Sequence, residues 1–195
     1  MNLRTALVVA SMAMAVGVPA GIQAVEDDPL DALNRTIQAR FAGIDKAFGL
    51  RRIVVLGDTP HQFRPETVSE EAVVQELRDA KLEVALYMAG RRVLEREPNL
   101  KTDTPGVVNR RVIFGPIAVT AFERIGELPH SVDLIDEART AFRELQHRDR
   151  YNFAMQDWKF SARAVRVTSS DCLTCHTGRK PGDPLGVVAY AYRSR

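Results

Sequence analysis

The chain has 195 residues, of which 45% are hydrophobic and 27% are charged. These proportions are those of a globular protein with a packed core, and the length suits one ordinary domain. The 27 basic and 25 acidic residues are mixed along the chain and leave a formal net charge of +2. Because no basic stripe with interleaved aromatic residues is present, the sequence does not indicate nucleic-acid binding.

The first 24 residues have the layout of a cleavable secretory signal. An uncharged apolar run, Thr5–Val18, follows a short segment with one positive charge and precedes small residues. We expect cleavage after Ala24, with Ala20 as the second choice. A retained membrane anchor is the alternative, but the run is shorter than the roughly 20 residues that a spanning helix needs. Residues 25–195 are therefore expected to act as one domain outside the cytoplasm, periplasmic or secreted, with no stable membrane span.

Helices and strands are predicted along the first half of the mature chain from the spacing of its apolar residues. They are a helix over Pro29–Phe48, a strand over Arg51–Leu56, a helix from Ser69 to about Ala80, and a hairpin of Leu82–Met88 and Arg91–Leu94 around a turn at Ala89–Gly90.

The second half is predicted to contain more strands than helices. The expected elements are a strand within Arg110–Phe122 with a bulge or edge break at Gly115-Pro116, a helix over Ser131–Gln146, two strands within Tyr151–Val167, a turn at Ser169–Asp171, and a final strand over Leu185–Tyr192. The order predicts an α+β domain, with an antiparallel sheet of about five strands flanked by three helices.

The strongest chemical signal is Cys172-Leu-Thr-Cys175-His176, which contains both cysteines of the chain. Two thiols at this spacing reach the two vinyl groups on one edge of a porphyrin, and the next residue presents an imidazole to the iron. The motif therefore predicts one covalent haem c, attached through Cys172 and Cys175, with His176 as an iron ligand.

Three other interpretations of the motif compete with haem attachment. A thioredoxin-type dithiol has no need of His176. A structural zinc site needs four ligands, and no second cluster of cysteine and histidine lies at normal spacing. A structural disulfide is possible in an exported protein, although so tight a loop stabilises little. Export favours haem, because c-type haem is attached outside the cytoplasm.

The second axial ligand of the iron is open from sequence alone. Met155 is the first candidate, because it shares a strand face with Tyr151 and Phe153 and is close in sequence to the motif. His130 is the next candidate, and a vacant position is the third possibility. The remaining candidates are expected to be ordinary surface or core residues: His61, His147 and Met88.

Several residues near the motif have two possible roles. Four basic residues are candidates for pairing with the haem propionates, or for solvated charges: Arg163, Arg166, Arg179 and Lys180. Trp158 and Phe160 are candidates for packing on the porphyrin face, or for filling the core.

The last 40 residues resemble a known haem family. Trp158–Val165, then the Cys172–His176 motif, then Gly182-Asp-Pro-Leu-Gly186 before a final strand, are similar to the periplasmic single-haem domains with a PAS-like fold, found alone or as bacterial sensor modules. The resemblance implies a PAS-like antiparallel sheet in which a strand leads into the motif. Some members are thought to use a cysteine as the distal ligand, which this chain lacks because both of its cysteines lie in the motif.

Three functions follow as expectations. The first is an exported mono-haem cytochrome that acts in electron transfer or redox sensing, with a periplasmic redox or sensor partner. The second is a haem-based sensor of a diatomic gas with an open distal site, and the third is a small haem enzyme. The sequence contains no paired carboxylates, triad or metal cluster that indicates independent catalysis.

Overall fold

The structure, a computed structural model, describes residues 29–42, 61–95, 113–120 and 128–195. The predicted signal over 1–24 and the predicted strand over Arg51–Leu56 lie outside these residues. Among the described residues no helix is long and apolar enough to cross a membrane.

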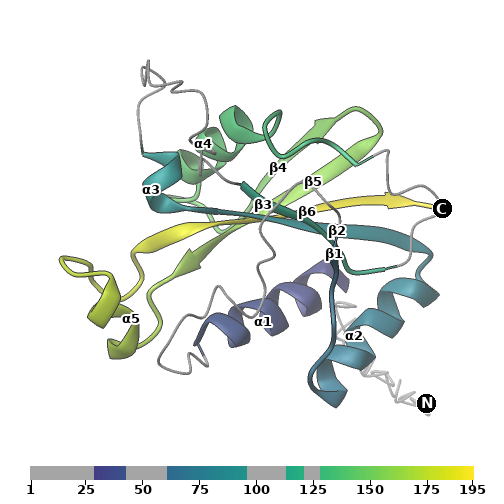
Figure 1. Cartoon of the computed structure of the whole chain (residues 1–195), viewed down its shortest axis with the longest axis horizontal. Helices are drawn as coiled ribbons and strands as arrows, with labels where there is room; N and C mark the ends of the chain where they lie inside the picture. The colour runs from purple at the N-terminus through teal and green to yellow at the C-terminus, as the bar shows by residue number, and fades with distance from the viewer. Residues whose placement is uncertain (1–28, 43–60, 96–112, 121–127) are drawn as a thin grey trace, which may run out of the picture.

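The core of the fold is an open antiparallel sheet with the strand order β3-β2-β6-β5-β4 (Figure 1). The strands are β2 (Leu82–Gly90), β3 (Ile113–Ala118), β4 (Tyr151–Met155), β5 (Trp158–Arg166) and β6 (Pro184–Ser194). A two-residue strand, β1 (His61–Gln62), is added to β3 in parallel. The predicted α+β architecture, an antiparallel sheet of about five strands flanked by helices, is thereby confirmed.

Helices cover both faces of the sheet, so its central strands are buried on both sides. Strand β2 contributes Ala85, Tyr87 and Ala89 to one hydrophobic cluster and Val84, Leu86 and Met88 to another. Successive side chains of a strand point to opposite faces, so the two sets follow from the period of two. Every residue from position 83 to 89 is buried for this reason.

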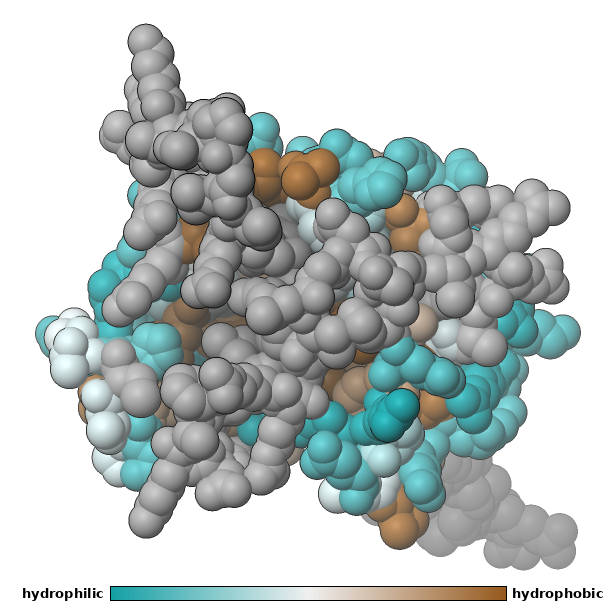
Figure 2. All heavy atoms as spheres, in the orientation of Figure 1, coloured by the Kyte–Doolittle hydropathy of each residue, from teal (hydrophilic) through white to brown (hydrophobic). Residues whose placement is uncertain are grey.

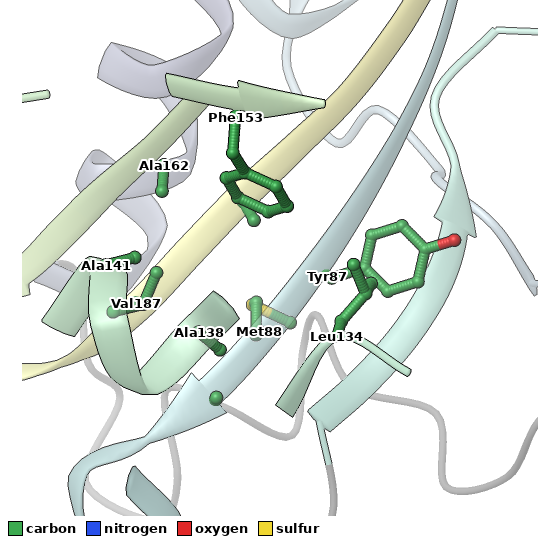
Figure 3. Close-up of a pocket in the computed structure, with 10 residues that line it drawn as sticks. Tyr87, Met88, Leu134, Ala138, Ala141, Phe153, Ala162 and Val187 are labelled. Atoms are coloured by element: carbon green, nitrogen blue, oxygen red, sulfur yellow. The ribbon is translucent and has the colours of Figure 1, made fainter. Parts of the chain in front are cut away.

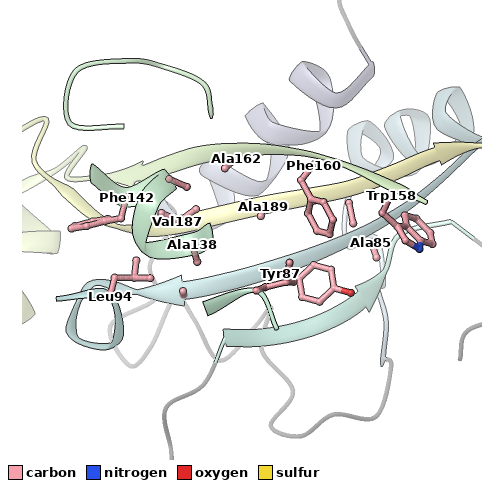
Figure 4. Close-up of a cluster of buried hydrophobic side chains, with 14 of the residues drawn as sticks. Ala85, Tyr87, Leu94, Ala138, Phe142, Trp158, Phe160, Ala162, Val187 and Ala189 are labelled. Carbon is pink, nitrogen blue, oxygen red and sulfur yellow. The ribbon is translucent and has the colours of Figure 1, made fainter. Parts of the chain in front are cut away.

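The first face is covered by α4 (Ile135–Glu144), with α3 (Arg91–Leu94) beside it (Figures 1 and 4). Ala138, Ala141 and Phe142 of α4 pack against Phe160 and other residues of the sheet. The second face is covered by α1 (Pro29–Ala42) and α2 (Val68–Asp79). There Leu33, Ile37 and Leu77 are fully buried.

Little large apolar surface is left exposed among the described residues. Figure 2 shows the hydrophobic residues of one face as separate patches among hydrophilic ones. Val68 and Val132 are the large apolar side chains that the described residues expose. The apolar residues are therefore used mainly in the two clusters that hold the helices on the sheet.

The predicted hairpin at Ala89–Gly90 is wrong. Strand β2 continues through Ala89 and Gly90, which pair with Val187 and Gly186 of β6, and Arg91–Leu94 is the short helix α3 rather than a returning strand. Leu94 is buried in the first cluster beneath α4. The edge of β2 that a returning strand would need is already paired with β6. A helical turn instead places Leu94 over the end of the sheet.

Most other predicted elements are present with small changes of boundary. Helices α2 and α4, the β4–β5 hairpin around Gln156-Asp157 and the final strand β6 are confirmed. Gly115 and Pro116 lie at a register shift, where Leu86 pairs with Ile117 and Met88 pairs with Phe114. The predicted bulge is therefore confirmed. The predicted helix Pro29–Phe48 is present as α1, and its last six positions lie outside the described residues.

Candidate functional site

The Cys172–His176 motif lies on a loop that connects the neighbouring strands β5 and β6. Backbone hydrogen bonds close the base of the loop, from the Val167 N–H to the Asp183 carbonyl (2.9 Å) and from the Gly182 N–H to the Val167 carbonyl (2.9 Å). Residues 168–181 project from the end of the sheet, where Figure 1 shows α5 opposite the C-terminus. The sheet therefore presents the motif on a loop with a fixed base.

The motif itself forms a short helix, α5 (Ser170–Cys175), instead of the turn predicted at Ser169–Asp171. Ser169 is the N-cap in an extended conformation, and Asp171 lies in the first turn, where a negative charge is favourable. The last hydrogen bond runs from the His176 N–H to the Cys172 carbonyl (3.0 Å). Positions 172 and 175 are three apart in one helical turn, so both lie on the same side of α5.

The Cys172 side chain is buried, with 4% of its surface exposed. Its Sγ lies 3.6 Å from the Ser169 hydroxyl oxygen. Burial raises the pKa of the Cys172 thiol, but hydrogen bonds from Thr168 and Ser169 outweigh burial and hold the pKa below that of an ordinary cysteine. The local hydrogen bonds thus favour the thiolate, the reactive form of cysteine.

His176 follows α5 as its C-cap and is exposed. Within the described part of the chain, its ring makes no hydrogen bond and no ion pair. Gly178 and Gly182 have positive φ angles of 77° and 89°, and no described atom lies within 4 Å of the position that a Cβ would take at either. An exposed imidazole directly after the two cysteines is a donor arrangement that fits an iron porphyrin held by this motif.

The flanking basic residues do not converge on the motif. Arg163 is buried beneath α1, where it donates to Asp31 (2.7 Å) and to Ser161 (2.6 Å). Arg166 donates to the Gly182 carbonyl at the base of the loop and to the Leu145 carbonyl at the end of α4. Two of the four predicted propionate partners are thus engaged elsewhere, and Arg179 and Lys180 remain on the loop itself.

Met155, the first candidate for the distal ligand, lies at the wrong end of the sheet. It pairs with Trp158, the first residue of β5, whereas the motif follows Arg166, the last residue of β5. The eight residue steps between the two ends of β5 span roughly 26 Å. The sequence predicted proximity because Met155 is near the motif along the chain, but an extended strand separates them in space.

Trp158 and Phe160 are core residues. Phe160 stacks on Phe153 with ring centroids 4.6 Å apart, and Trp158 lies under Arg193, whose guanidinium is 4.5 Å from the ring centroid. Both side chains are at most 1% exposed. Of the two roles predicted for them, the structure assigns core packing.

The other candidate ligands differ in position. Met88 lies two residues from the end of β2 that faces α5, but it is 2% exposed and sits in the second cluster. His130 and His147 are exposed in the segments before and after α4. His61 pairs with Ile117 in β1. Residues 43–60, 96–112 and 121–127 contain no histidine, methionine or cysteine. Together with Met155, these four residues are therefore every such side chain of positions 25–195 outside the motif.

A small apolar cavity lies between α4 and the sheet (Figure 3). Its volume is about 10 Å³, which is the space of one water-sized sphere. Alanines contribute much of its lining, including Ala138 and Ala141 of α4, together with Val187 and Phe153. The cavity is far too small for a porphyrin, and no candidate ligand other than the buried Met88 borders it.

Comparisons of this chain with protein-family models, with curated proteins and with solved structures found no match.

Proposed function

We propose that the chain is an exported mono-haem c-type cytochrome that acts in electron transfer or redox sensing. The observation that carries the proposal is the position of the Cys172–His176 motif. It occupies a short helix on a loop anchored to the neighbouring strands β5 and β6, with an exposed imidazole directly after it. A loop with a fixed base keeps its ligands in place, and exposure brings the cofactor edge close to a partner protein.

In this proposal each residue of the motif has a defined task. Cys172 and Cys175 hold the porphyrin covalently, and His176 coordinates the iron. Haem supplies reversible one-electron exchange when bound. The hydrogen bonds from Thr168 and Ser169 to Cys172 favour its reactive thiolate form, which suits a residue that must form a covalent bond.

The strand order supports a PAS-like interpretation of the domain. Counted along the chain, the five antiparallel strands are ordered 2-1-5-4-3, so that the first and last strands lie side by side in the centre. The helix α4 lies between the second and third of these strands in the chain. This is the arrangement expected of the PAS-like family that the last 40 residues resemble.

Covalent attachment is the first test of the proposal. The full chain, expressed in the periplasm of a host with haem-ligation machinery, is expected to retain peroxidase stain on a denaturing gel at the size of the mature protein. Cys172→Ala/Cys175→Ala is expected to lose the stain. Met155→Ala is the matched control and is expected to keep it, since Met155 lies at the far end of β5. An unstained wild-type band of mature size would contradict the proposal.

A gas-binding function is the second candidate, and the location of the methionines favours it. Met155 is roughly 26 Å along the strand from the end that bears the motif, and Met88 is buried in the core. With neither methionine as ligand, the distal position is taken by a histidine or is open. An open position leaves high-spin iron that binds diatomic gases.

Absorption spectra of the ferric and ferrous protein, with and without carbon monoxide, separate the two functions. A low-spin ferrous spectrum that carbon monoxide does not change supports the electron carrier. A high-spin ferrous spectrum with rapid carbon monoxide binding supports the gas sensor. In either case we expect Met155→Ala to leave the spectra unchanged, and a change of spin state in this variant would show that the distance argument is wrong.

A further inference from the structure

Arg166 connects the loop that carries the motif to the end of α4. Its guanidinium donates one hydrogen bond to the Gly182 carbonyl at the base of the loop (3.0 Å). Two more hydrogen bonds run from the guanidinium to the carbonyls of Leu145 (2.7 Å) and Arg148 (3.5 Å). Leu145 is the C-cap of α4. One half-buried side chain thus bonds to two segments that are otherwise distant in sequence.

The local structure of β5 directs Arg166 to this position. The pairing register between β5 and β6 shifts between Val165 and Arg166, and Arg166 then lies opposite Pro184, which has no N–H to donate. The last carbonyls of α4 have no partners within the helix and need donors from outside. A planar guanidinium with several N–H groups can serve carbonyls on both segments at once, which a lysine cannot.

Helix α4 rests on the sheet through side chains of unequal size, and its end near Arg166 carries the buried Phe142 and Leu145. Its contacts with the sheet include Ala138 and Ala141, which border the small apolar cavity (Figure 3). Small side chains beside unfilled space do not interlock as large ones do. The bonds from Arg166 add a polar connection between the end of α4 and the base of the loop.

We propose that Arg166 is a positioning residue, which fixes the loop carrying Cys172, Cys175 and His176 relative to α4 and so sets the orientation of the His176 ring at the iron. This inference rests on the proposed haem attachment. The two backbone hydrogen bonds at Val167 anchor the loop base to the sheet, and they do not depend on the Arg166 side chain. Loss of the side chain therefore removes the connection between the loop base and α4, while the backbone anchor and the haem attachment stay in place.

The test compares Arg166→Gln and Arg166→Lys with wild type in the full-length exported protein. Arg143→Gln is the control, because Arg143 is an exposed residue of α4 whose guanidinium bonds to Thr140. The readout is the electron paramagnetic resonance spectrum of the ferric haem, which reports ligand orientation. Covalent haem content is measured in the same samples by stain on a denaturing gel.

We expect wild type and Arg143→Gln to share one set of g-values, and Arg166→Gln to shift them or split them into several sets. Arg166→Lys is expected to be intermediate, because it retains a cation that can bond to one carbonyl. If Arg166→Gln does not fold, the lysine variant decides by the same shift. Wild-type g-values in the folded variants, with haem attached, would overturn the inference. Wild-type protein without covalent haem would overturn the proposed function, and the inference with it.

Discussion

At the scale of single residues, a buried cation that the sequence offered as a candidate partner of the haem propionates has its partner inside the fold. The Arg163 side chain is 7% exposed and pairs with Asp31, which also accepts from Arg150 (2.6 Å). Burial by itself raises the pKa of the Asp31 carboxyl, but the hydrogen bonds and charges of Arg163 and Arg150 outweigh it and hold the pKa below the usual range. The pair fastens the first turn of α1 to β5.

Asp31→Asn is expected to destabilise the fold, because it leaves Arg163 buried without a carboxylate. We expect a loss of about 2 kcal/mol at pH 7, less than the roughly 3–5 kcal/mol of a fully buried pair, since Asp31 is 33% exposed. The lowered pKa means that the contribution is complete above about pH 4 and is lost as the pH falls towards the folded-state pKa.

Urea unfolding at pH 7 and pH 3 measures both effects. The difference between wild type and Asp31→Asn is expected to shrink at pH 3. Asp136→Asn is the control, because the Asp136 side chain is 87% exposed in its pair with Arg139. Its expected loss is below about 0.5 kcal/mol. Equal midpoints for the two variants at pH 7 would show that the Arg163 pair does not hold α1.

At the scale of the elements, the pairing of β2 with β6 depends on one glycine next to the loop of the motif. Gly90 and Gly186 are direct partners across the two strands. A Cβ on Gly186 would overlap the carbonyl oxygen of Ala89, which is backbone and cannot move aside without disturbing β2. No described atom lies within 4 Å of the position of a Cβ on Gly90. The two glycines therefore have different tolerances although they face each other.

Gly186→Ala is expected to cost about 2 kcal/mol of stability, the typical effect of forcing an extra carbon into a packed interior. Gly90→Ala is the matched variant and is expected to change stability by less than about 0.5 kcal/mol. Thermal or urea unfolding of the two proteins measures the difference. If both alanines are tolerated equally, the close approach of β6 to Ala89 in this structure is wrong.

At the scale of the whole molecule, the motif lies outside both hydrophobic clusters. The first cluster is enclosed by α4 and the second by α1 and α2, on opposite faces of the sheet (Figure 1). The loop over 168–181 extends beyond the end of the strands, and Cys172 is the one residue of α5 whose described side chain is fully buried. The sheet thus acts as a rigid support, while the proposed chemistry takes place on the segment that it carries.

The sequence by itself determined the features that depend on neighbours within a few residues. Apolar spacing identified α2, α4, the β4–β5 hairpin and β6, because a helix or strand that buries one side must repeat its apolar residues at a set period. The Cys172–His176 motif was visible for the same reason, since its ligands lie within one turn of backbone.

Only the tertiary structure decided which residues meet across long distances in the chain. Met155 lies at the end of β5 far from the motif, and β2 continues through Gly90, which pairs with Gly186. Arg163 binds Asp31, and Arg166 binds the end of α4. These partners are separated by many residues, and local spacing carries no information about them. Because a strand of nine residues runs the length of the sheet, residues at its two ends are close in sequence but far apart in space.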